Sequence, residues 1–144
     1  KLIGALLTAA ESTGTCAATL DTVVSYLTSR IQFGRLIGSY QALKHPTVDM
    51  LIQMDSARSL IYHAATVISG QPLDQDAEIA CRMAKAQATE ALLFAGDRAI
   101  QFHGGMGFTY DCDAQLFLRR ALGSQHQYGD AQHHRLRLAR LLLD

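Results

Sequence analysis

Small residues recur with helical spacing between residues 77 and 102, and this rhythm constrains the fold more than any other feature of the chain. Because these positions lie three or four residues apart in a near-heptad pattern, they share one face of an α-helix. A stripe of such small side chains lets neighbouring helices pack closely. The stripe, which we call the small-residue stripe, consists of Ala77, Cys81, Ala84, Ala88, Ala91, Ala95, Ala99 and, at its end, the larger Phe102.

The ends of this predicted helix carry recognisable signals. The Gln71-Pro72 break precedes it, and Asp74 or Asp76 is placed to cap its first turn. At the other end the pattern stops at Gly104 and Gly105, which take positive φ angles without steric cost. We therefore predict one long helix that ends in a sharp glycine turn.

Residues 2–30 also show helical periodicity. Their apolar positions recur at three- and four-residue intervals: Ala17, Leu20, Val24 and Leu27. Gly14 interrupts this segment at a cost of about 1 kcal/mol relative to alanine, which indicates close packing or a bend. Gly34 and Gly38 then bracket a predicted loop.

A further long helix follows this loop and is predicted to end near Gly70. Pro46 fits only a first helical turn, so residues 40–45 are either a separate turn or a kinked lead-in. The apolar positions that define the helix are Val48, Leu51, Ile52, Leu60, Ile61, Ala64, Ala65 and Ile68. Two shorter helices are predicted at residues 114–122 and 131–143, parted by residues 123–129.

No segment has a convincing strand pattern, and 144 residues are enough for one domain with a core. We predict an all-α fold: an antiparallel four-helix-bundle-like domain with extra short C-terminal helices. The chain begins in mid-pattern without a start methionine or a signal peptide, so we interpret it as the C-terminal part of a longer protein.

Charge, hydropathy and cysteine usage limit the possible partners. Thirteen basic residues balance thirteen acidic ones, which predicts no nucleic acid and no anionic membrane as a partner. No apolar run is long enough to span a bilayer. Cys16, Cys81 and Cys112 are odd in number and far apart, which favours a reduced, cytoplasmic setting with at least two packed as small hydrophobes.

A metal centre is not expected. A di-iron bundle needs Glu-x-x-His pairs, and none of Glu11, Glu78 and Glu90 has a histidine three residues later. His133 and His134 are adjacent, so on a helix their side chains diverge by about 100° and do not chelate one ion. Their arginine-rich surroundings indicate a solvated or interface helix, and we predict no metal site.

Two separated segments suggest a ligand. In the glycine turn, successive N–H groups can form an anion-binding nest, and Gln101 can offer its amide to the same place, although a plain helix cap is the alternative. Earlier, Arg30 supplies a permanently charged fork suited to a pyrophosphate, and Phe33 offers a ring for stacking. The alternative there is an arginine that satisfies helix carbonyls and a phenylalanine that fills the core.

Together these segments resemble the C-terminal helical domain of the acyl-CoA dehydrogenase family. That domain carries Y-x-x-x-R-x-Q-F-G…Q and, later, Q-x-x-G-G-x-G-[FY]. The resemblance covers essentially the whole chain, so we expect residues 1–144 to be this domain, without the family's N-terminal and middle domains. The matching residues are Tyr26, Arg30, Gln32, Phe33, Gly34, Gln41, Gln101, Gly104, Gly105, Gly107 and Phe108, and Asp49, Met50, Lys85 and Arg119 also match.

The resemblance implies an oxidoreductase, a flavoprotein of fatty acid metabolism that oxidises the Cα–Cβ bond of an acyl-CoA. A carboxylate base removes the α-proton, the β-hydride passes to FAD, and electrons leave to an electron-transferring flavoprotein. The domain would build a homo- or hetero-oligomer, a dimer or tetramer. The resemblance also implies that the segment around Arg30 of one subunit and the glycine turn of its neighbour hold the FAD adenosine diphosphate. The implied FAD residues are Arg30, Gln32, Phe33, Gln41, Gln101, Gly104 and Gly105.

The chain departs from the family where the base is expected. The usual glutamate position holds Tyr128, and a second family position falls near Gly4, so neither carries a carboxylate. Tyrosine has an unperturbed pKa of about 10 and is a poor base near neutral pH. Asp130 is a weak candidate, because it replaces the family's threonine. Arg120 stands where an aspartate is common, which predicts a rearranged or lost ion pair.

These departures resemble family members that lack the base and form heteromeric dehydrogenases with a competent partner subunit. Two other readings stay open: a structural or assembly subunit of the same fold, and an unrelated helical interaction bundle. The fragment alone is expected to be inactive.

Overall fold

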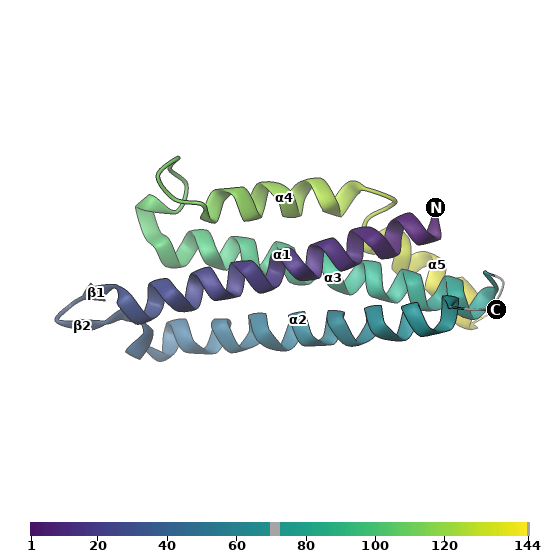
Figure 1. The fold of residues 1–144 in the computed structure, drawn as a ribbon, viewed down its shortest axis with the longest axis horizontal. Helices are drawn as coiled ribbons and strands as arrows, with labels where there is room; N and C mark the ends of the chain where they lie inside the picture. The colour runs from purple at the N-terminus through teal and green to yellow at the C-terminus, as the bar shows by residue number, and fades with distance from the viewer. Residues whose placement is uncertain (70–72, 144) are drawn as a thin grey trace.

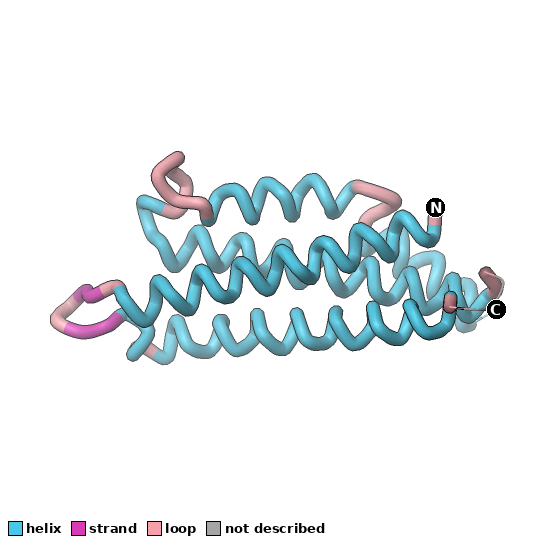
Figure 2. Tube along the Cα trace, viewed as in Figure 1, coloured by secondary structure: helices cyan, strands magenta, loops and turns pink. Residues whose placement is uncertain are grey.

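The protein is a helical bundle with one small hairpin, shown by a computed structural model that describes residues 1–69 and 73–143 (Figure 1, Figure 2). The predicted all-α class is confirmed. The helices are α1 (Leu2–Ser29), α2 (Gln41–Ile68), α3 (Gln75–His103), α4 (Ala114–His126) and α5 (Ala131–Leu143).

Helix α3 forms the centre of the bundle, because it contacts each of the other four helices. Helices α1 and α3 run in the same direction, and α2 and α4 run in the opposite one (Figure 1). Every residue of the small-residue stripe is buried, from Ala77 at the start of α3 to Phe102 near its end. The predicted packing role of the stripe is therefore confirmed.

Both cap and cysteine predictions can be checked. The Asp74 carboxylate accepts a hydrogen bond from the backbone N–H of Ala77 at 2.9 Å, so Asp74 rather than Asp76 is the N-cap of α3. The Gln71-Pro72 break and Gly70 lie outside the described residues. Cys16 and Cys81 are fully buried, as expected for small apolar side chains. Burial raises the pKa of the Cys16 thiol to about 11.

The connection between α1 and α2 is a hairpin, which corrects the prediction of a loop without strands. Strand β1 (Ile31–Gln32) pairs antiparallel with β2 (Arg35–Leu36), and a short 3-10 helix (Ile37–Ser39) follows. Phe33 and Gly34 form the two-residue turn, and both have positive φ, of 54° and 76°. Tight hairpin turns favour this geometry because it matches the strand twist.

Helix α2 begins earlier than predicted. The carbonyl oxygen of Tyr40 accepts hydrogen bonds from the N–H groups of Leu43 and Lys44, so the helix starts at Gln41 and includes Pro46. Its buried face is also shifted, because tertiary contacts rather than hydropathy select it. The buried residues are Met50, Met54, Ala57 and Ala64, whereas Val48, Leu51 and Ile52 are exposed.

Two glycines in helices behave differently from expectation. Helix α1 is continuous through Gly14, and a Cβ built there meets no atom within 4 Å. The prediction that Gly14 packs closely against another part of the chain is therefore wrong. Helix α4 continues through Gly123 to His126 instead of ending at residue 122, because Ser124 in its last turn is buried against the bundle.

Candidate functional site

The two segments singled out in the sequence meet at one end of the bundle. Because α1 and α3 run in the same direction, the hairpin after α1 and the glycine turn after α3 emerge at the same end (Figure 1). Between them lies an open pocket of about 290 Å³, which we call the motif pocket. It is lined by Tyr26, Arg30, Gln32, Phe33, Ile37, Tyr40, Leu43, Phe102, His103 and Gly104.

The motif pocket collects only part of the predicted set. Arg30, Gln32, Phe33 and Gly104 line it, whereas Gln41, Gln101 and Gly105 are exposed and lie outside its lining. Within one chain the two segments adjoin, because the ends of its two parallel helices lie together. The expectation that the segments holding one FAD come from different subunits stays a prediction.

Phe33 does not fill the core, so that alternative interpretation is wrong. Its side chain is 90% exposed at the tip of the hairpin, and its φ of 54° is unusual for a bulky residue. Arg30 is exposed, and no ion pair involving it occurs within residues 1–69 and 73–143. An exposed aromatic ring and an unpaired guanidinium beside one pocket are suited to a ligand with a ring and a negative charge.

Among the lining residues, the sequence assigns no role to His103 and indicates Tyr26 only as a motif match. The His103 ring is buried and stacks on Tyr26, with ring centroids 4.0 Å apart. Its Nδ1 lies 2.7 Å from the carbonyl oxygen of Ala99, which assigns the proton to Nδ1 and leaves Nε2 as an acceptor in the neutral ring. Tyr26 and His103 are far apart in sequence, so no local pattern indicated their stacking.

Tyr40 braces the hairpin beside the pocket. The Arg35 guanidinium lies 3.8 Å from the centroid of the Tyr40 ring, and Phe33 meets the same ring edge-on at 6.4 Å. Such cation–π and edge contacts hold the strands without burying the tip. At the glycine turn α3 ends at His103, as predicted, and of the two glycines Gly104 takes positive φ, of 60°, and Gly105 does not.

A second place of interest is the connection between α4 and α5, residues 127–130, which we call the Tyr128 turn. Tyr128 and Gly129 both have positive φ, of 61° and 105°. The Tyr128 ring lies on Gly4 of α1, because a Cβ built on Gly4 would be 2.6 Å from Tyr128 Cζ. The two positions where the resemblance places a base are therefore in contact, and neither carries a carboxylate.

The Tyr128 turn is held from inside by Lys85. This lysine is fully buried in α3, and its Nζ donates hydrogen bonds to the carbonyl oxygens of Ser124 and Gly129, both at 3.1 Å. Burial lowers the pKa of Lys85 to about 8, and the charge of Asp130 opposes this shift. The ammonium thus satisfies the Ser124 carbonyl in the last turn of α4, which has no partner within the helix, and the Gly129 carbonyl in the turn itself.

His134 lies beside this lysine, which corrects the prediction of a solvated histidine pair. Its side chain is only 1% exposed, whereas His133 is exposed. The guanidinium of Arg82 lies 3.3 Å from His134 Nδ1. Burial, followed by the charges of Lys85 and Arg82, lowers the pKa of His134 to about 4, so the ring is neutral near pH 7.

Asp130 and Arg120 have structural partners. The Asp130 carboxylate accepts a hydrogen bond from the backbone N–H of His133 at 2.7 Å, which caps α5. Its role as a base stays a prediction. Arg120 pairs with Glu11 of α1, and both side chains are about half exposed. This ion pair joins α4 to α1.

No group of three or more potential metal ligands occurs in the part of the chain that the structure describes. Across residues 1–69 and 73–143, no helix combines the length and the apolarity needed to cross a bilayer.

Comparison with known proteins agrees with the fold and with the predicted family. The family model for the C-terminal domain of acyl-CoA dehydrogenases matches residues 3–143. Acyl-CoA dehydrogenase IpdE2 of Mycolicibacterium smegmatis is 38% identical over 125 residues, covering 87% of this chain and 38% of that protein.

Solved structures show the same arrangement. A chain of the ChsE4–ChsE5 complex from Mycobacterium tuberculosis is similar with a TM-score of 0.92 and 26% identity, covering 99% of this chain and 38% of that chain. A chain in a structure of the electron transferring flavoprotein of Acidaminococcus fermentans has a TM-score of 0.88 and 34% identity, over 97% of this chain and 36% of that one.

The chain therefore spans little more than a third of the length of these relatives. The residues matched by the family model, 3–143, span the hairpin, the glycine turn and the Tyr128 turn. The chain belongs to the acyl-CoA dehydrogenase family and corresponds to its C-terminal helical domain.

Proposed function

We propose that this chain is the FAD-binding and oligomerisation domain of an acyl-CoA dehydrogenase, and that the motif pocket receives the adenosine diphosphate part of FAD. The observation that carries this proposal is the convergence of Arg30, Phe33 and Gly104 on one pocket. The guanidinium provides charge and paired donors for a pyrophosphate, and the phenyl ring provides a stacking surface. Gly104 lets a ligand approach the backbone closely.

The residues present fit such a group. The pocket holds about 290 Å³ and is open, so it suits one portion of the cofactor, while the rest would extend beyond this chain. Bound FAD supplies the hydride acceptor for the oxidation of the acyl-CoA. The residues of this chain bind and orient it: Arg30 offsets phosphate charge, and Phe33 and the stacked Tyr26–His103 pair form apolar and polar walls.

The test uses the complete polypeptide that contains this chain. Arg30→Met should lower FAD affinity at least tenfold, because a buried or partly buried charge-assisted contact contributes roughly 1.5–3 kcal/mol. Flavin absorbance after gel filtration and fluorescence titration of the apoprotein measure this loss. Arg137→Met, on an exposed face of α5, is the matched control. Equal FAD retention in both variants would contradict the proposal.

We further propose that the subunit depends on a partner for its catalytic base. The contact between Tyr128 and Gly4 supports this, because both base positions are occupied without a carboxylate. Similarity to a chain of the ChsE4–ChsE5 complex also supports a heteromer. Exposed apolar residues on α2, among them Val48 and Ile52, offer surface for a homo- or hetero-oligomer, a dimer or tetramer.

Flavin bleaching separates the possibilities. The protein is purified alone and together with its candidate partner subunit, and each preparation is mixed with a panel of acyl-CoA substrates. Bleaching only with the partner supports the heteromer, with an electron-transferring flavoprotein as the expected electron acceptor. Bleaching of the lone protein would place a base in this chain, and Asp130→Asn would then test Asp130. Absence of flavin from both preparations would favour the structural or assembly subunit.

A further inference from the structure

Thr13 differs from the other threonines of α1 in the hydrogen bonding of its hydroxyl group. Its side chain is only 6% exposed, yet its hydroxyl has no hydrogen-bond partner among the described residues. Every other threonine of this helix donates its hydroxyl to the carbonyl oxygen four residues earlier, so Thr13 is free of the usual backbone bond. Those other residues are Thr8, Thr15, Thr19, Thr22 and Thr28.

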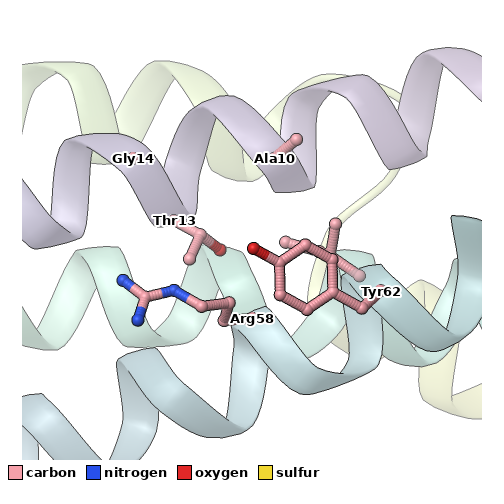
Figure 3. Close-up of a pocket in the computed structure, with 6 residues that line it drawn as sticks. Ala10, Thr13, Gly14, Arg58 and Tyr62 are labelled. Atoms are coloured by element: carbon pink, nitrogen blue, oxygen red, sulfur yellow. The ribbon is translucent and has the colours of Figure 1, made fainter.

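Thr13 lines a pocket of about 230 Å³ between α1 and α2 (Figure 3). In this view the Tyr62 hydroxyl points toward the Thr13 hydroxyl, and the Arg58 guanidinium lies on the other side of Thr13. Gly14 contributes no side chain and leaves open space beside them. The remaining lining residues, Ala10 and Ile61, are apolar, so no carboxylate lines the pocket.

The guanidinium of Arg58 keeps donors for a ligand. Its Nη1 pairs with Asp55 at 3.1 Å, but this pair joins neighbouring turns of one helix, and the two side chains are 45% and 56% exposed. Exposed pairs of this kind are weak because water screens them. Guanidinium groups have five N–H donors and accept none, and hydroxyls also donate.

We propose that this pocket binds an oxyanion, a carboxylate or phosphate group that accepts hydrogen bonds from Thr13, Arg58 and Tyr62. A buried hydroxyl without a partner costs free energy, and an acceptor at this place removes that cost. The same chemistry has two possible sources: a free small anion, or an acidic side chain of another subunit. Thr13 lies roughly 25 Å along α1 from Arg30, so the site is separate from the motif pocket.

The first experiment measures the melting temperature of the complete protein in sodium phosphate, sodium acetate and sodium chloride at constant ionic strength. A ligand that binds only the folded state raises the melting temperature with concentration. We expect such a rise with phosphate or acetate, and a loss of at least tenfold in apparent affinity in Thr13→Val and Arg58→Gln. Thr19→Val is the matched control, because Thr19 is buried on the same helix but its hydroxyl is already bonded.

The second experiment identifies the source by sedimentation equilibrium without added phosphate or acetate. If an acidic side chain of another subunit occupies the pocket, Thr13→Val and Arg58→Gln raise the dissociation constant of the oligomer about tenfold, and free anions compete. If the source is a free anion, oligomerisation is unchanged. FAD content should stay normal in both variants, so failure here is distinguishable from failure of the proposed function.

The proposal is overturned if Thr13 affects neither anion dependence nor assembly. In that case Thr13→Val raises the melting temperature by the same amount in all three salts, because it only removes an unpaired buried hydroxyl. The isosteric valine fills the same volume, so the variant is expected to fold.

Discussion

The motif pocket and the Tyr128 turn lie at opposite ends of α1 and differ in how far their side chains are buried and paired within the chain. At the motif pocket, Phe33 is exposed and Arg30 has no ion-pair partner among the described residues. At the Tyr128 turn, the polar groups find partners within the chain. Lys85 donates hydrogen bonds to two carbonyl oxygens, and the Tyr128 ring covers Gly4. The Arg30 and Phe33 side chains of the first region are exposed and lack such partners in the part of the chain that the structure describes, and the second region is closed by internal contacts.

This contrast has an energetic consequence. Exposed side chains without partners contribute little to the stability of the free chain, whereas removing one partner of a buried, hydrogen-bonded charge is strongly destabilising. Substitutions at the Tyr128 turn should therefore act on stability, and those at the motif pocket should act on binding.

Replacement of Lys85 should have the largest effect. Lys85→Met removes both hydrogen bonds and leaves two inward carbonyl oxygens without a donor, so we expect a destabilisation of about 3 kcal/mol. Urea denaturation of the complete protein measures it. Lys44→Met, on the exposed surface of α2, should change stability by less than about 0.5 kcal/mol. Equal effects of the two substitutions would contradict the prediction that Lys85 stabilises the turn.

Acid should lower the stability of the folded protein by protonating His134, which lies beside Lys85. Its pKa is lowered to about 4 in the folded protein from a reference of 6.5, so between these values the unfolded state binds more protons. Stability should rise with pH across this window and fall by about 3 kcal/mol as the pH drops from 6.5 to 4. His134→Gln should flatten this limb of the stability profile, and His133→Gln should leave it steep. A wild-type profile without this limb would contradict the burial of a neutral ring.

Gly4 and Tyr128 should be energetically coupled. Gly4→Ala places a Cβ against the Tyr128 ring, and because the ring can swing toward solvent the expected cost is about 1 kcal/mol. Tyr128→Gly removes the clash and relieves the positive φ, so the double variant should regain the loss. A double-mutant cycle by denaturation measures the coupling, and additive effects would mean that the two residues do not touch.

The motif pocket should show the opposite behaviour. Phe33→Gly suits the positive φ of the hairpin turn and should leave stability unchanged or raise it by up to about 1 kcal/mol. The same change removes the stacking surface and should weaken FAD binding several-fold in a fluorescence titration. A loss of stability with unchanged FAD affinity would reverse the distinction between the two regions.

Local pattern was enough to predict most of the secondary structure. The small-residue stripe predicted α3 and its buried face, and Asp74 predicted its start, because helical spacing and caps depend on neighbouring residues. The errors arose where local signals compete with distant contacts. Pro46 lies inside α2, and Val48 is exposed although it belongs to an apolar rhythm, because tertiary packing selects which face is covered.

The site divides in the same way. Arg30, Phe33 and Gly104 were identifiable from their motifs, since each motif is a short continuous run. The stacking of His103 on Tyr26 and the bonds from Lys85 to Ser124 and Gly129 were not, because they join residues on different helices.

Periodicity, caps and motifs are properties of neighbouring residues, so the amino-acid sequence alone predicted the helices, the family and the motif residues at each end of the bundle. Only the tertiary structure decided that α1 and α3 finish together at one pocket, that Tyr128 covers Gly4, and that Thr13 faces Arg58 across a gap. These pairings depend on the direction and packing of whole helices. They come from many weak contacts spread over the core, and no single stretch of residues encodes them.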